Sequence, residues 1–253
     1  MRRLIEMGAD VQAIERGKYT PLHWATWEGN VEAAELLIRH GADPSFQAKD
    51  KRGNLRASAL HSAADMRWPQ NPKMLEFLIR HGASVDSCDG QGRTPLIVAA
   101  AGHCRASMLR VLLDHGADVD ATDRHNRTAL YLAADSHRVD AAALLIERGA
   151  NVHVVDTWGY TPLMLACQSG DHVDFIELLI DNGAKVNERA NGPHNTALHR
   201  AVSAKNLPVV KLLLANGADA QIRDQNGVTP IDIAKQQKLN AIELLLRRSS
   251  QMP

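Results

Sequence analysis

The chain has 253 residues, and its 29 Lys and Arg residues balance its 29 Asp and Glu residues, so the formal net charge is zero. This balance gives no support to bulk phosphate binding and argues against nucleic acid as a partner. We find no run of 18 apolar residues and no signal peptide, and we therefore expect no insertion into a membrane. Three scattered cysteines, Cys88, Cys104 and Cys167, form no disulfide framework and favour a reducing intracellular compartment, the cytoplasm or the nucleus.

A tetrapeptide similar to Thr-Pro-Leu-His recurs along the chain, followed about twenty residues later by an apolar run and usually Gly-Ala. The third residue of each copy is, in order, Leu22, Leu60, Leu96, Leu130, Leu163, Leu198 and Ile231. Successive gaps are 38, 36, 34, 33, 35 and 33 residues. Self-similarity at a nearly fixed period predicts a stacked repeat array. Such arrays present extended binding surfaces.

Residues 156–186 show the repeating unit most clearly. A turn at 156–160 precedes Thr161, a predicted N-cap, and Pro162, which suits the first helical position. A second helix is predicted over 173–181, where apolar residues recur with helical periodicity, and Gly183 ends it. Neither helix can bury its apolar face alone, so each unit needs its neighbours.

This skeleton resembles the ankyrin-repeat family, whose signature is T-P-L-H-x-A at a period of 33 residues. The resemblance covers nearly the whole chain and implies an all-α solenoid of stacked helix-turn-helix units with β-hairpin fingers. We place a partial repeat at residues 1–13. Seven repeats are expected to follow, at residues 14–43, 44–86, 87–120, 121–153, 154–187, 188–220 and 221–253.

The two ends of the chain differ. Residues 4–11 match the end of a second helix and its exit, so the chain begins inside a repeat. We favour a fragment of a longer protein over an unusual half-repeat cap. At the other end, Arg247 and Arg248 suit a helix C-terminus and predict the outer cap of the array. Ser249, which follows them, lies either in a solvated tail or in a site for a basophilic kinase.

Insertions distinguish the second repeat from the others. From the exit glycine to the next tetrapeptide most repeats have 12 residues, but Gly41 to Ser58 is 17, which lengthens the second finger by five residues. A further excess lies at residues 66–72, between the two helices of this repeat. Insertions in repeat arrays map to loops, often on the binding face.

The sequence predicts no catalysis, no cofactor and no metal site. His23, His61 and His199 are the tetrapeptide histidines, which in the family bond neighbouring backbone. His40 and His81 precede exit glycines, as does His115, where a helix C-terminus favours them. No H-E-x-x-H, G-x-S-x-G, Walker or G-x-G-x-x-G pattern occurs.

The resemblance implies that a partner lies across the concave groove made by the finger tips and first helices. Trp, Tyr and Arg dominate interface energetics, and all four tryptophans fall in these regions or in the second-repeat insertion. The groove should also include Met164, with Arg124 and His125 at finger tips. The partner-binding residues that we predict are Arg16, Lys18, Tyr19, Trp24, Trp27, Arg52, Trp68, Arg93, Arg127, Trp158, Tyr160, Gln168 and Arg200.

These features favour a non-catalytic, monomeric interaction module that binds a protein or peptide, with acidic residues facing the basic fingers. The alternative is a regulatory domain of a larger enzyme or channel whose activity lies outside this chain. Direct nucleic-acid binding is the weakest reading because the net charge is zero. The family is also known for asparagine hydroxylation at the exit Val-Asn, which here matches Val186-Asn187 and makes Asn187 a candidate modification site.

Overall fold

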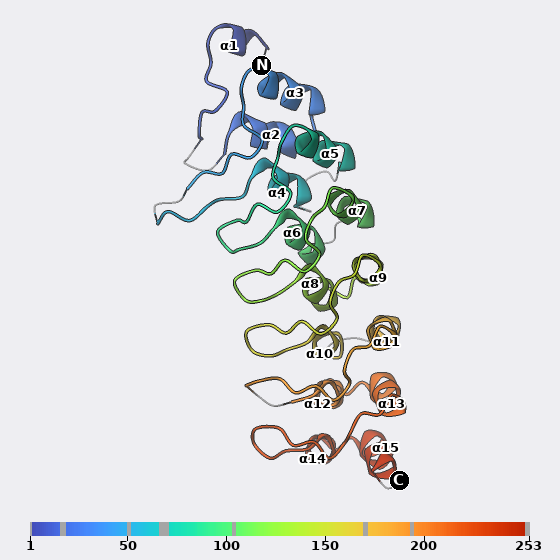
Figure 1. The fold of residues 1–253 in the computed structure, drawn as a ribbon. Helices are drawn as coiled ribbons and strands as arrows, with labels where there is room; N and C mark the ends of the chain where they lie inside the picture. The colour runs from blue at the N-terminus through green and yellow to red at the C-terminus, as the bar shows by residue number, and fades with distance from the viewer. Residues whose placement is uncertain are drawn as a thin grey trace. The chain divides into compact units, whose positions relative to one another are not determined.

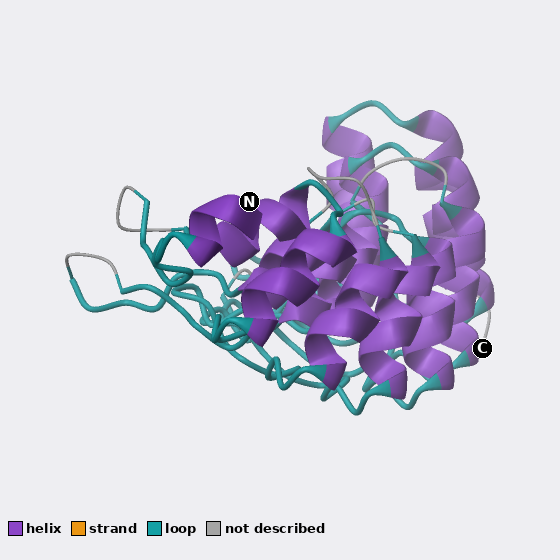
Figure 2. Ribbon diagram, turned by 90° about the horizontal axis from the view of Figure 1, so that it is seen from above, coloured by secondary structure: helices purple, strands orange, loops and turns teal. Residues whose placement is uncertain are grey.

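The computed structural model describes residues 2–15, 19–49, 52–65, 71–102, 105–168, 172–192 and 195–250. The chain forms two compact units, Met1–Arg124 and His125–Pro253. In each unit, short helices alternate between two stacks, and loops project from the side of the first stack (Figures 1 and 2). Helical hairpins stacked in this way confirm the all-α repeat architecture.

In both units the helices come in pairs, a first helix that opens with the tetrapeptide and a second helix that ends before the exit glycine. The first unit contains α1 (Arg2–Glu6) and the pairs α2 (Pro21–Trp27) and α3 (Val31–Arg39), α4 (Ala59–Ala64) and α5 (Pro72–Arg80), and α6 (Pro95–Ala101) and α7 (Ala106–Asp114). The second unit contains α8 (Ala129–Asp135) and α9 (Val139–Glu147), α10 (Pro162–Ala166) and α11 (Val173–Asp181), α12 (Ala197–Ser203) and α13 (Leu207–Ala215), and α14 (Pro230–Gln236) and α15 (Asn240–Ser249).

The helix boundaries follow from the capping residues. The Thr161 hydroxyl oxygen accepts a hydrogen bond from the backbone N–H of Met164 at 3.2 Å, and Pro162 occupies the first helical position. The second helix of this repeat spans Val173–Asp181, as predicted. Gly183 ends it with a φ of 91°, in the left-handed region that glycine tolerates.

Close packing between repeats depends on small residues in the first helices. Ala64 on α4 and Ala99 and Ala100 on α6 have no exposed surface, so neighbouring first helices approach closely. The second helices supply larger apolar side chains to the same core, such as the fully buried Leu75 and Leu109. Each unit thus buries its apolar residues between the two helical stacks, while the loops are left to vary.

The loops that precede the first helices, here called fingers, differ from the expected β-hairpins. Within the described ranges no strand forms, and the fingers contain two isolated antiparallel bridges, Glu15–Tyr19 and Lys49–Leu55. Other fingers close with few backbone hydrogen bonds: in the fifth, Asp156 N–H donates to the carbonyl of Tyr160 at 3.1 Å and Gly159 N–H donates to the carbonyl of Asp156 at 2.9 Å. The two sides of a finger thus run antiparallel as in a hairpin, but among the described residues too few pair to form β-strands.

The tetrapeptide histidines connect consecutive repeats. The Nδ1 atom of His61 accepts the backbone N–H of Ser58 at 3.2 Å, so Nε2 is the protonated nitrogen and donates to the carbonyl of Arg93 at 2.8 Å. His23 and His199 make the equivalent bonds to the carbonyls of Ala57 and Val228. The predicted role of these histidines is confirmed, and each bond reaches into the next repeat.

These histidines make stability depend on pH. Burial lowers the pKa of His23, His61 and His199 below the ordinary value of 6.5, although the hydrogen bond from each ring to a carbonyl acts in the opposite direction. Below about pH 6.5 the unfolded chain therefore binds more protons than the folded chain, and the free energy of unfolding decreases as the pH falls. We expect the thermal unfolding midpoint to drop between about pH 7.5 and about pH 5.5.

The His61→Gln variant should show a shallower pH dependence than the wild type, because Gln removes one of the buried histidines whose pKa is lowered. The matched control is His153→Gln, which removes an exposed histidine instead of a buried one. Equal slopes for His61→Gln and the wild type would contradict this account.

Substitution of two glycines that share a positive φ distinguishes the cost of backbone strain from the cost of a steric clash. Gly159 and Gly217 both have a φ of 79°, but a Cβ on Gly159 would collide with the backbone nitrogen of Asn191, whereas one on Gly217 meets nothing within 4 Å. We expect Gly217→Ala to reduce the free energy of unfolding by about 1 kcal/mol. Gly159→Ala should cost about 1 to 3 kcal/mol more. Urea denaturation of the two variants measures the difference, and equal losses would show that the fifth and sixth fingers do not touch.

Candidate interaction surface

The predicted binding residues lie on one side of each unit, which we call the finger face: the fingers together with the outward sides of the first helices (Figure 2). Arg16, Lys18 and Trp68 lie outside the described residues. The remaining predicted residues gather at separate places in the two units.

Aromatic side chains cluster at the start of the first unit. The ring centroid of Trp27 lies 4.5 Å from that of Tyr19 and 4.8 Å from that of Trp24, in edge-to-face arrangements. Trp24 is 43% exposed, whereas Trp27 is only 7% exposed. Trp24 is thus the tryptophan of this cluster that a partner can reach, and Trp27 supports it from below.

Helical periodicity explains why Trp27 and Met164 do not stand on the surface where the sequence analysis placed them. Trp27 follows the buried His23 by four residues, so both lie on the inward stripe of α2. Met164 occupies the position of the tetrapeptide histidine and is 1% exposed. Trp27 still lines a small hollow of about 70 Å³ together with Tyr19 and Arg93.

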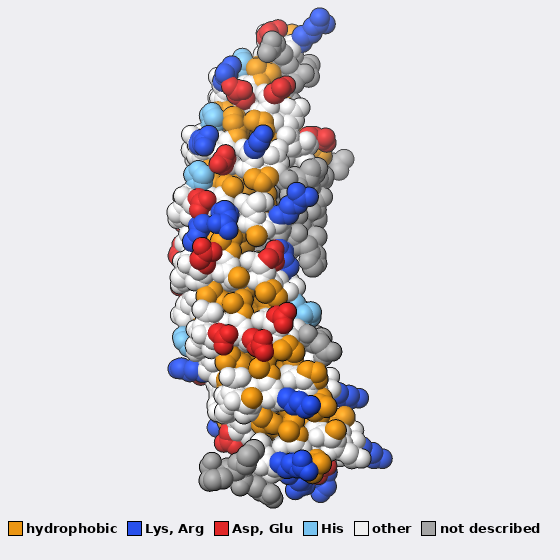
Figure 3. Space-filling view, turned by 90° about the vertical axis from the view of Figure 1, so that its right-hand side faces the viewer, with side chains coloured by type: hydrophobic (Ala, Val, Ile, Leu, Met, Phe, Trp, Pro, Cys, Tyr) orange, Lys and Arg blue, Asp and Glu red, His pale blue; other side chains and the backbone are white. Residues whose placement is uncertain are grey.

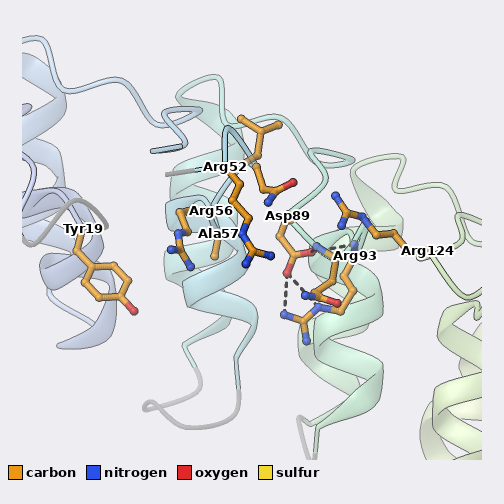
Figure 4. Close-up of a pocket in the computed structure, with 11 residues that line it drawn as sticks. Tyr19, Arg52, Arg56, Ala57, Asp89, Arg93 and Arg124 are labelled. Carbon is orange, nitrogen blue, oxygen red and sulfur yellow. Dashed lines mark hydrogen bonds and ion pairs between the residues drawn. The ribbon is translucent and has the colours of Figure 1, made fainter. Parts of the chain in front are cut away.

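A larger hollow of about 580 Å³ lies on the finger face of the first unit, and we call it the arginine pocket. Its walls come from four successive fingers: Tyr19 from the first, residues 52–57 from the second, residues 89–93 from the third and Arg124 from the fourth. Figure 4 shows Arg52 and Arg56 on one side of Asp89, and Arg93 and Arg124 on the other. Of its lining residues, Tyr19, Arg52 and Arg93 were predicted binding residues.

Asp89 is the acidic residue of the arginine pocket, and its carboxylate is fully engaged. One oxygen accepts the backbone N–H groups of Gln91 and Arg93 at 2.8 and 3.0 Å, and the other accepts the Nε and Nη2 of Arg93 at 3.0 and 2.7 Å. Burial alone would raise the pKa of Asp89, but the hydrogen bonds from Arg93 and Gln91 outweigh it and lower the pKa. Asp89 therefore stays charged and holds Arg93 against the third finger.

The second unit has its own polar hollow, of about 390 Å³, lined by Gln168, His199 and Arg200 among others. The guanidinium carbon of Arg200 lies 4.1 Å from the ring centroid of Tyr160, a cation–π geometry, and Nη1 donates to the Gln168 side-chain carbonyl. Three predicted residues, Tyr160, Gln168 and Arg200, thus meet across neighbouring repeats.

Trp158 lies at the tip of the fifth finger and is 53% exposed. Its ring stacks on that of His125, with centroids 5.5 Å apart and planes 17° apart. Arg127, another predicted arginine, is half-buried and lies just before the tetrapeptide of the fourth repeat. Stacking fixes the Trp158 ring while leaving one face open, which suits a contact residue.

The two candidate modification sites have distinct surroundings. The Asn187 side chain is exposed and bridges to the next repeat, donating to the carbonyl of Gly217 at 2.8 Å and accepting the N–H of Asp219 at 2.9 Å. The Ser249 hydroxyl donates to the carbonyl of Leu246 at 2.8 Å in the last turn of α15 and is half-buried. Both assignments stay predictions.

Arg56 joins the pocket although the sequence analysis did not select it. It lies in the lengthened second finger, whose backbone is held by a 2.7 Å hydrogen bond from Arg56 N–H to the carbonyl of Ala48. The side chain of Gln47 also donates to the carbonyls of Arg56 and Cys88, and so connects the second finger to the third. The five-residue insertion was the available signal, but only the folded finger shows which of its residues face the pocket.

The side of the second helices has a different character. Figure 3 shows acidic and basic side chains interspersed with hydrophobic ones on this side. Among the described residues, no cluster of three or more His, Cys, Asp or Glu side chains is arranged to hold a metal ion. The described helices are all too short or too polar to span a lipid bilayer.

Comparison with known proteins gives matches along almost the whole chain. A profile described as Ankyrin repeats (3 copies) matches residues 60–156, 107–190, 149–224 and 189–252, and one described as Ankyrin repeat matches residues 17–51.

Three similar proteins illustrate the range of relatives. "Putative palmitoyltransferase ZDHHC13" of Danio rerio is 33% identical over 174 residues, covering 64% of this chain and 23% of that protein. Cyclin-dependent kinase 4 inhibitor B of Mus musculus is 35% identical over 99 residues, covering 39% of this chain and 70% of that protein. Ankyrin repeat and SOCS box protein 3 of Homo sapiens is 30% identical over 172 residues, covering 67% of this chain and 32% of that protein.

The aligned region is 23% of the length of the palmitoyltransferase and 32% of that of Ankyrin repeat and SOCS box protein 3, and 70% of that of the kinase inhibitor. What is common to the matches is therefore the repeat region itself. The stacked helix pairs, the tetrapeptide caps and the matching profiles lead to one assignment. The chain belongs to the ankyrin-repeat family, whose repeats are generally protein-interaction modules.

Proposed function

We propose that this chain is a non-catalytic protein-interaction module, a scaffold, adaptor or regulatory domain, which binds a protein or peptide segment along its finger face. The observation that supports this most directly is the exposure of two tryptophans on that face, 43% for Trp24 and 53% for Trp158. Tryptophan is among the residue types from which interface hot spots are most often built.

Neighbouring side chains hold both tryptophan rings in place before a partner binds. Trp24 is held edge-on by Trp27, and Trp158 is stacked on His125, so little side-chain entropy is lost when a partner covers them. Arginines line hollows of the same units, Arg93 in the first and Arg200 in the second. In either unit, an extended segment can therefore bury apolar surface on the tryptophan and place polar groups against an arginine.

A selection experiment tests the finger face. Short random peptides displayed on phage are enriched on the wild-type chain and then measured against a Trp24→Ala, Trp158→Ala double variant. We expect the enriched peptides to bind the double variant at least about tenfold more weakly, because truncation of a hot-spot tryptophan costs that much or more. Trp27 is unsuitable for this purpose because it is 7% exposed, and its truncation would destabilise the fold by about 3 to 5 kcal/mol.

Leu244→Ala is the matched control. Leu244 lies on α15 and is 52% exposed, nearly the same as Trp158, but it belongs to a second helix. Peptide affinity should be unchanged in this variant. If Leu244→Ala weakened binding while the tryptophan variant retained it, the assignment to the finger face would be wrong.

The relatives support a second candidate, a regulatory domain of a larger enzyme or channel. A palmitoyltransferase is named among the similar proteins, and the aligned region is 23% of its length. In that case the repeats would recruit a protein to an activity encoded elsewhere in the same polypeptide. The complete open reading frame decides between the candidates, because a catalytic or channel domain in frame with the repeats would establish the second.

A further inference from the structure

The arginine pocket of the first unit has more positive charge than its own acidic residue can neutralise. Four guanidinium groups, those of Arg52, Arg56, Arg93 and Arg124, line one hollow, and among its described lining residues the carboxylate is that of Asp89 (Figure 4). Over the whole chain basic and acidic residues are equal in number, so this concentration is local. Like charges gathered in one hollow repel one another unless an anion lies between them.

The carboxylate of Asp89 is already saturated by its own finger. It accepts two backbone N–H groups and two N–H groups of Arg93. Each carboxylate oxygen has two partners, which leaves no strong acceptor site for Arg56 or Arg124. Asp89 thus positions Arg93 and has no acceptor left for Arg56 or Arg124.

Two of these arginines have donors without acceptors. In the described part of the chain, the guanidinium groups of Arg56 and Arg124 make no hydrogen bond or ion pair, and the Nε of Arg56 is buried with no partner. A guanidinium group carries five N–H donors and no acceptor, so the buried Nε of Arg56 is costly without a partner, whereas the exposed Arg124 can donate to water. A carboxylate or phosphate group entering the pocket would bring acceptor oxygens to these donors.

We propose that the arginine pocket receives one acidic side chain of a bound peptide segment, an aspartate, a glutamate or a phosphorylated residue. Arg56 and Arg124 supply the donors, and Arg93 lies beside them, fixed by Asp89. Planar guanidinium groups match carboxylate and phosphate geometry with paired hydrogen bonds. This inference rests on the proposed function, since it assigns the chemistry of the segment that crosses the finger face.

The surroundings of the pocket favour a peptide over a nucleic acid. Tyr19 lines the same hollow, and the exposed Trp24 lies next to Tyr19, with ring centroids 6.4 Å apart. A peptide can place an apolar side chain on this aromatic surface while its acidic residue enters the pocket. Nucleic-acid sites depend on rows of phosphate contacts along a basic stripe, whereas this charge is confined to one hollow.

The test uses peptides enriched on the wild-type chain from a random library, remade in three synthetic forms. These forms carry glutamate, phosphoserine or glutamine at the position where an acidic residue recurs. Each form is titrated against the wild type and against an Arg56→Gln, Arg124→Gln double variant. The matched control is Arg39→Gln with Arg80→Gln, which removes the same charge from exposed positions on α3 and α5.

We expect the glutamate peptide to bind the pocket variant at least about tenfold more weakly than the wild type, and the control variant equally well. The glutamine peptide should bind both proteins weakly and nearly alike, because the two changes remove the same interaction in a double-mutant cycle. This coupling separates direct contact from a change in stability, and thermal unfolding midpoints of the variants check the fold. Tighter binding of phosphoserine than of glutamate would identify phosphorylated residues as the preferred source of the charge.

Other outcomes overturn the inference. Enriched peptides that lack an acidic residue, or that bind the pocket variant as tightly as the wild type, would remove the acidic anchor and leave the interaction module intact. Binding of a labelled single-stranded DNA oligonucleotide that is lost in the pocket variant, with peptide binding unaffected, would assign the pocket to nucleic acid. Failure to enrich any peptide over an albumin control would refute the proposed function and this inference together.

Discussion

An imidazole ring placed between two repeats is the contact that fixes three of the junctions in the array. In His23, His61 and His199 the Nδ1 atom accepts the N–H of the helix-capping residue, and this leaves Nε2 to donate to a carbonyl of the next finger. One ring therefore caps its own helix and fixes the following repeat. In the fourth repeat Tyr131 replaces the histidine, and its hydroxyl donates to the buried carboxylate of Asp156 at 2.6 Å, so the connection is kept by different chemistry.

The carbonyls that these histidines hold belong to Ala57, Arg93 and Val228, the residues immediately before the next tetrapeptides. Because the bond is made to the main chain, it does not depend on the side chain at that position. The three side chains differ completely in size and charge, yet the backbone beneath them is fixed in the same way. Arg93 shows the result: its carbonyl is bound by His61 while its guanidinium lies in the arginine pocket beside Asp89.

Much of the fold could be predicted from the sequence because its signals are local. The Thr161 cap, the helix at Val173–Asp181 and the exit at Gly183 each follow from residue types within a few positions. The buried positions of Trp27 and Met164 were missed, although the inward stripe that contains His23 already implied them. The fingers were expected as β-hairpins, but pairing depends on arm length, which the residue types alone do not give.

The arginine pocket shows where prediction from sequence stops. Arg56 and Arg124 are separated by 68 positions along the chain, and they share a hollow because the lengthened second finger and the fourth finger both reach it. Neither residue matches a motif. Their relation depends on the conformation of a loop with an insertion, and the repeat period contains no information about that conformation. Trp24 and Trp158 were easier to choose as candidate contacts, because residue type alone selects tryptophan, but the same criterion also selected the buried Trp27.

A ligand in the arginine pocket would also affect how the repeats of the first unit unfold. The polar ties described above, from His23 to Ala57, from His61 to Arg93 and from Gln47 to Cys88, each join one repeat to the next. An array built from such ties loses cooperativity with distance, so its repeats can open one after another. A ligand seated among Arg56, Arg93 and Arg124 would touch three fingers at once. A bound ligand would therefore couple the unfolding of three repeats. Binding in the pocket would then slow local opening at the edge of the unit.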